Sequence, residues 1–139
     1  MTLQSTVKTI QNIALTQHNV NYVGSGDIYA DLNANPNLKY GIVYITQNQH
    51  TSTDETDQYN FNIFYIDRLA NFEGDNRLQI QSTGKEVLEN IIRIFCDTYD
   101  AEIYGDIYWQ SFTERFSDLC AGIFCTVTLE IMKNIICAE

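Results

Sequence analysis

Cysteine and histidine are the residue types in this sequence that could supply a nucleophile and a base, or together bind a metal ion. Cys120 and Cys125 lie five positions apart, whereas His18 and His50 lie far upstream. A thiol activated by one of these imidazoles would make a cysteine-dependent enzyme, with Cys120, which follows a polar segment, as its nucleophile. The sequence contains neither a paired CxxC motif nor a histidine cluster, so its pattern does not indicate a zinc site.

The spacing of the two cysteines favours a structural role over a chemical one. Residues 119 to 131 have the composition of a strand, and an odd separation within a strand places Cys120 and Cys125 on opposite faces. Cys125 shares its face with an unbroken apolar row, which predicts a core position. Both histidines lie in polar stretches that nothing brings near Cys120. We therefore predict that the protein is not an enzyme and that it uses no cofactor and no metal.

Carboxylates form a second group of candidate functional residues. The polar segment between two predicted strands carries Asp54, Glu55 and Asp57, and its length exceeds that of a usual hairpin loop. It lacks the ligand alternation of a calcium-binding loop. A loop of this length is typical of contact with a partner. No apolar run is long enough for a signal peptide or a membrane span, so we expect no membrane partner and reduced cysteines.

Composition limits the classes of protein to which this chain can belong. The 139 residues carry a net charge of −10, and 45% of them are hydrophobic. This is too apolar for disorder, and the eight scattered basic residues do not provide the clustered charge with which proteins grip nucleic acid. We predict one domain, spanning residues 1–139.

Hydrophobic periodicity predicts an α+β fold. We expect an amphipathic helix over residues 2–17, an irregular segment with turns around one or two short strands to residue 39, and strands over 40–46 and 58–67. Thr83 and Glu86 fit a capping box at the start of a second helix. Strands are then predicted over 101–109 and 119–131, with an acidic loop between them. The expected architecture is a mainly antiparallel sheet of four or five strands with two helices packed on it.

Three segments resemble a known group of proteins: YNFNIFYIDRL, the downstream NRLQIQS, and WQSFTERFSDLCAGIFCTVTLEI. They look like small virion proteins of tailed bacteriophages, especially crAss-like phages, and the order of elements is similar to that of tail-terminator and neck-ring proteins. The resemblance covers residues 40 to 131, and FTERFSDLCAG is its most distinctive part. It implies a homo-oligomeric ring of six or twelve subunits that is assembled in the cytoplasm of the host bacterium.

Such a ring would belong to the neck or tail of the virion, beside portal, neck or tail proteins, and genomic DNA would pass through it without tight binding. The acidic loop would then face the channel or the neighbouring ring. Glu114, Arg115 and Asp118 form either an internal charge cluster or a subunit interface, for which Arg68 and Arg77 are further candidates. The alternatives are the cysteine-dependent enzyme and a cytosolic adaptor that binds peptides by strand addition.

Overall fold

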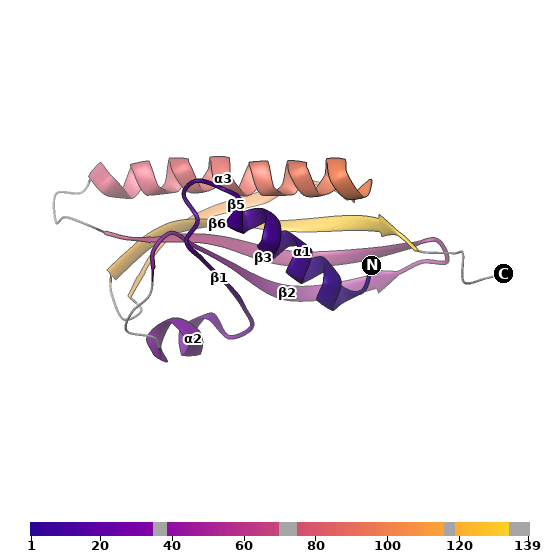
Figure 1. The fold of residues 1–139 in the computed structure, drawn as a ribbon, viewed down its shortest axis with the longest axis horizontal. Helices are drawn as coiled ribbons and strands as arrows, with labels where there is room; N and C mark the ends of the chain where they lie inside the picture. The colour runs from indigo at the N-terminus through magenta and orange to yellow at the C-terminus, as the bar shows by residue number, and fades with distance from the viewer. Residues whose placement is uncertain (35–38, 70–74, 116–118, 134–139) are drawn as a thin grey trace.

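The computed structural model describes residues 1–34, 39–69, 75–115 and 119–133, and these residues form an α+β fold with a mixed sheet (Figure 1). The predicted α+β class is confirmed. The predicted numbers of elements are wrong, because the described residues form a sheet of six strands rather than four or five, and three helices rather than two. In chain order the elements are α1 (Leu3–Leu15), β1 (Tyr22–Ser25), α2 (Ile28–Ala34), β2 (Ile42–Ser52), β3 (Thr56–Arg68), α3 (Asp75–Tyr99), β4 (Glu102–Ile103), β5 (Tyr108–Arg115) and β6 (Leu119–Met132).

The strands follow the order β1-β2-β3-β6, and both β4 and β5 pair with β6. Only β1 and β2 run parallel among the described pairs, so the mainly antiparallel character is confirmed. The long helix α3 covers one face of the sheet, with α1 beside it, while α2 lies against the other side at one end (Figure 1). At the opposite end the β2–β3 hairpin and the end of β6 extend beyond α3.

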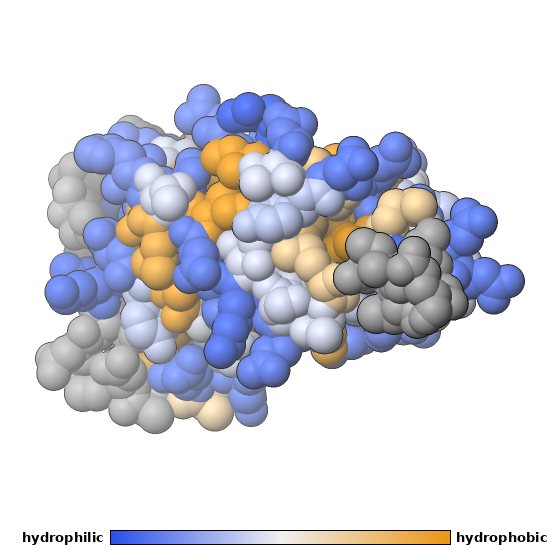
Figure 2. Space-filling model, turned by 45° about the vertical axis from the view of Figure 1, so that its right-hand side comes forward, coloured by the Kyte–Doolittle hydropathy of each residue, from blue (hydrophilic) through white to orange (hydrophobic). Residues whose placement is uncertain are grey.

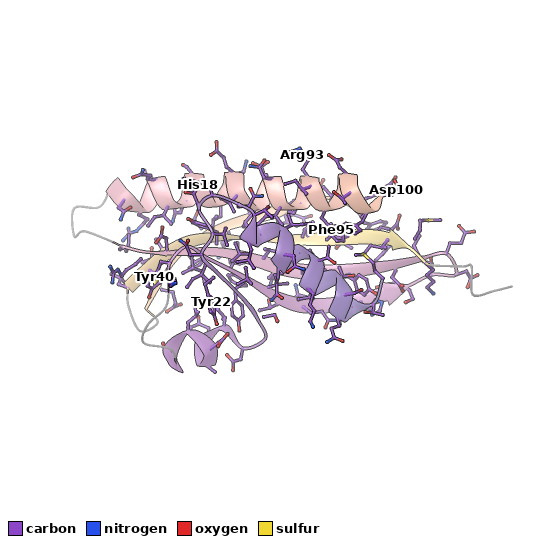
Figure 3. All side chains as sticks on the ribbon, viewed as in Figure 1. His18, Tyr22, Tyr40, Arg93, Phe95 and Asp100 are labelled. Carbon is purple, nitrogen blue, oxygen red and sulfur yellow. The ribbon has the colours of Figure 1, made fainter. Side chains whose placement is uncertain are left out.

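The core lies between the sheet and the pair α1 and α3. On β3 the alternating residues Tyr59, Phe61, Ile63 and Tyr65 are all buried. On β6 the predicted apolar row is buried as well; it comprises Ala121, Ile123, Cys125, Val127, Leu129 and Ile131. The helix α3 presents Phe95 to the sheet and directs Arg93 away from it (Figure 3).

The two long helices begin in different ways. The predicted first helix is confirmed, and it begins with a capping box in which Thr2 accepts a hydrogen bond from the Ser5 N–H at 3.1 Å. The capping box predicted for the second helix is wrong. Helix α3 begins at Asp75, so Thr83 and Glu86 lie inside it. Inside a helix each backbone N–H already donates to a carbonyl one turn earlier, so the threonine has no free N–H to cap.

The long loop predicted between the first two strands is also wrong. Strand β2 runs to Ser52 and β3 starts at Thr56, and the short turn is closed by the Thr53 N–H, which donates to the Thr56 carbonyl at 2.8 Å. A segment that is polar on both faces has the composition of a loop, which is why the sequence predicts one here. It tolerates this composition because the hairpin extends beyond the helices and has no core to cover.

Two other segments also differ from the prediction. The irregular stretch contains the short helix α2 as well as the expected short strand. In place of one strand over residues 101–109, the chain forms the two-residue β4 and then β5, which takes up most of the predicted acidic loop. Gly105, with a φ of 76°, provides the left-handed backbone between them.

Candidate assembly surfaces

The side chains of Cys120 and Cys125 are buried and pack inside the fold. Cys125 is fully buried between the sheet and the helices, and burial raises the pKa of its thiol to about 12. Cys120 lies on the opposite face, as the strand alternation predicted, and it is not the accessible thiol that the enzyme alternative requires. It is fully buried in a second apolar cluster with Leu32 of α2 and Ile66 of β3. A thiol in this position is closed to a substrate. Cys137 lies outside the described residues.

The acidic residues of the predicted loop lie around the tip of the β2–β3 hairpin. Asp54 and Glu55 are exposed in the turn, and the Glu55 carbonyl accepts a hydrogen bond of 2.7 Å from the Lys133 N–H at the end of β6. Asp57 is half-buried, at the start of β3. Figure 2 turns this end of the molecule forward and shows apolar patches interspersed with hydrophilic side chains.

His50, Ser52 and Asp57 meet at the hairpin tip, but their geometry is not that of a catalytic triad. Ser52 Oγ donates directly to Asp57 Oδ1 at 2.7 Å, while His50 Nε2 lies 3.4 Å from both of those atoms. A triad needs the imidazole between the two groups, with one ring nitrogen facing each. The Ser52 hydrogen bond lowers the pKa of the Asp57 carboxyl, against a smaller effect of burial that raises it. The cluster therefore holds the hairpin tip together as a charged, ordered end.

The predicted interface residues divide between the two sides of the sheet. Glu114 of β5 and Arg68 of β3 lie in one cross-strand row with Cys120 between them, which separates their backbones by about 10 Å. The Tyr29 hydroxyl donates to Glu114 at 3.1 Å, and the Arg68 guanidinium lies 5.8 Å from the centre of the Tyr40 ring. Arg77 is exposed on α3, which covers the other face. The Arg115 side chain and Asp118 lie outside the described part of the chain.

The face of the sheet opposite α3 carries a polar feature that the sequence reasoning missed. Asn48, Asn60, Asn62, Thr126 and Thr128, here called the polar ladder, connect β2, β3 and β6. Asn48 Nδ2 donates to Asn60 Oδ1 at 2.7 Å and to Asn62 Oδ1 at 3.1 Å. Thr126 Oγ1 donates to Asn62 Oδ1 at 2.7 Å, and Asn60 Nδ2 donates to Thr128 Oγ1 at 2.8 Å. The ladder is uncharged along its length.

The same face becomes aromatic toward α2. The Phe64 ring centre lies 4.9 Å from that of Phe124 and 6.0 Å from that of Phe112. Together with Ile28 and Tyr29 of α2, these rings and Glu114 line a cavity of about 270 Å³. The open face of the sheet, meaning the polar ladder with this aromatic cluster, could have been read from the sequence: the residues between the core positions of QYNFNIFYID are amides followed by Phe64.

No known protein family matches the chain, and no curated protein matches it significantly in sequence. Within the described ranges, no group of three or more His, Cys, Asp or Glu side chains is placed to hold a metal ion. No helix in the described part of the chain has the length and apolar character needed to cross a membrane.

Proposed function

We propose that this protein is a structural subunit of a tailed-phage virion that assembles into a ring of six or twelve copies in the neck or tail. The ring contributes to the channel through which DNA passes and contacts the portal, neck or tail proteins next to it. It is assembled in the host bacterial cytoplasm. The tail-terminator-like resemblance of residues 40 to 131 motivates this proposal, and the surface of the protein supports it.

The observation that carries the proposal is the polar ladder, an uncharged part of the open face on a chain with a net charge of −10. Copies of so acidic a protein repel one another unless the surfaces that meet are free of like charge. The polar ladder meets that requirement, and Glu130, which accepts a hydrogen bond from Gln58 at 2.8 Å, lies beyond its end on the same face. Its amides and hydroxyls already pair with one another, which reduces the cost of removing water from them on contact.

The acidic hairpin tip has a compatible role. It extends past the end of α3, where Asp54 and Glu55 face solvent. At the channel or against the neighbouring ring, its carboxylates repel DNA phosphates over a distance of only about 8 Å at physiological salt. DNA then slides past without being held, because the eight Lys and Arg residues are scattered along the sequence and do not offer clustered charge to its backbone.

The test is the mass of the purified protein over a range of concentrations, measured by native mass spectrometry and imaged by negative-stain electron microscopy. We expect ring-shaped particles of six or twelve copies. Asn62→Asp retains the oxygen that accepts the hydrogen bonds of Asn48 and Thr126 and adds one charge to the open face, so it should weaken assembly without unfolding the subunit.

Asn90→Asp is the matched control, because it makes the same change at an exposed position of α3. It should leave assembly unchanged. A wild-type protein that stays monomeric at high concentration, and that does not join portal or tail proteins, would overturn the proposal. A stable monomer with one defined protein partner would favour the adaptor instead.

A further inference from the structure

One side of strand β2 is only partly paired. Strand β1 is four residues long and pairs with β2 only from Ile42 to Ile45. Strand β2 continues to Ser52, and among the described strands none pairs with residues 46–52 on that side. Every second residue of an unpaired strand edge offers its backbone N–H and C=O to another strand. Because β1 is short, the edge of β2 beyond Ile45 is open to another strand.

A groove of about 420 Å³ lies at this place, between α1 and the edge of the sheet. Its lining combines apolar and polar side chains, among them Leu3, Val7 and Lys8 of α1, Ser25 of β1, and Ile45 and Gln47 of β2. Gln47 is opposite Phe61 in the strand register, so its side chain lies on the helix-covered face of the sheet, where it lines the groove. A strand added here would gain backbone partners from β2 and a groove for its side chains.

We infer that the β2 edge and this groove accept strand β5 of a second copy of the chain. At the far end of the sheet, β5 pairs only with β6 among the described strands, which leaves its outer edge open. Its eight residues are enough to cover the unpaired part of β2. Its side chains at 108–113 are uncharged, and Tyr108 is 67% exposed.

The charges of the two edges favour β5 as the occupant. Asp106 precedes β5, and Glu114 and Arg115 form its end, so charged residues flank an uncharged centre. Strand β2 leads into the acidic hairpin tip with Asp54 and Glu55. The uncharged centre of β5 therefore lies along β2 without like-charge repulsion.

The two edges lie at opposite ends of one sheet, so the contact is head-to-tail. Such a contact repeats from copy to copy and closes when the rotation per subunit divides a full turn. The inference rests on the proposed ring and adds to the open-face contact a pairing of strand edges between neighbouring subunits. It places the β5 end of each sheet beside the β2 edge of the next.

The experiment combines a cross-link with a charge substitution in the full chain. A photoreactive benzoyl-phenylalanine introduced at position 47 should cross-link assembled copies, and peptide mass spectrometry should find the second end of the link within residues 108–115. Gln47→Glu adds an acidic group facing the incoming strand and should raise the concentration needed for half-assembly about fivefold. Gln79→Glu, the same change at an exposed position of α3, should leave that concentration unchanged.

The outcomes separate the two proposals. Rings that form with links only outside residues 108–115, or with Gln47→Glu assembling as Gln79→Glu does, would overturn the strand contact and leave the ring intact. A wild-type protein that remains monomeric would overturn both. The cross-link does not depend on the Gln47→Glu variant, so the strand contact is testable even if that variant folds poorly.

Discussion

Gly84→Ala sets helix propensity against packing at the point where α3 comes closest to the sheet. Gly84 is buried inside α3, and a Cβ atom there would lie 2.7 Å from Tyr65 Cδ2 and 2.8 Å from Ile123 Cγ2. These atoms belong to an aromatic ring on β3 and a β-branched side chain on β6. Both side chains are buried, so neither has free space into which it can move.

The two effects have opposite signs. In an exposed helix, replacing glycine by alanine stabilises by about 1 kcal/mol. Forcing an extra methyl group into a packed interface costs about 1–3 kcal/mol. Packing should dominate, and we expect Gly84→Ala to lower the free energy of unfolding by about 1 kcal/mol, with a fall in Tm of about 3 °C for a domain of this size.

Urea denaturation followed by circular dichroism measures this change. Ser82→Ala is the matched control, because Ser82 is exposed on the same helix, and it should stabilise the protein by about 0.5 kcal/mol. If Gly84→Ala stabilised the protein by as much as propensity alone predicts, α3 would not lie this close to β3 and β6, and the description of the core would be wrong.

Three further predictions concern the core and the hairpin tip. Cys125, whose pKa burial raises to about 12, should react with a thiol probe at neutral pH far more slowly in the folded protein than in urea, and equal rates would contradict its burial. Val127→Asp should prevent folding, because an unpaired carboxylate in this fully buried position costs several kcal/mol; a soluble variant with an unchanged melting curve would refute the strand assignment. Ser52→Ala should raise the pKa of Asp57 in an NMR titration. Because its pKa is lowered in the folded protein, Asp57 stabilises the fold at a pH above the ordinary carboxyl pKa, and this contribution is lost as the pH falls through the folded pKa. A Ser52→Ala variant in which Asp57 titrates as in the wild type would show that the Ser52 hydrogen bond does not cause the lowered pKa.

The sequence predicted the parts of the fold that bury apolar side chains on one face. The alternation of Tyr59, Phe61, Ile63 and Tyr65, and the row through Cys125, allowed only one orientation of each strand, because a shift of one residue would expose every core side chain. The first helix was predictable for the same reason. Its apolar residues recur at helical spacing and meet one surface.

The errors occurred where the chain has no single apolar face. The hairpin tip is polar on both sides, so its strands could not be distinguished from a loop. The start of α3 carries an exposed Leu78 and few buried residues, which concealed the turns before Thr83. Helix α2 is short, and its place depends on contacts of Leu32 with Ile42 and Ile66 that only the tertiary fold creates.

The candidate surfaces were predictable in part. The acidic tip was located from composition, although its shape was not. The row that brings Arg68 and Glu114 to either side of Cys120 depends on a strand register that joins distant segments of the chain. The polar ladder was within reach of sequence reasoning, since Asn60 and Asn62 alternate with core residues of a predicted strand.

The most direct test of the account is the mass of the wild-type protein in solution as its concentration rises. The account predicts a cooperative change from the 16.0 kDa subunit to one closed species of six or twelve copies, with no further growth. A protein that remains at the mass of one chain at every concentration would contradict it.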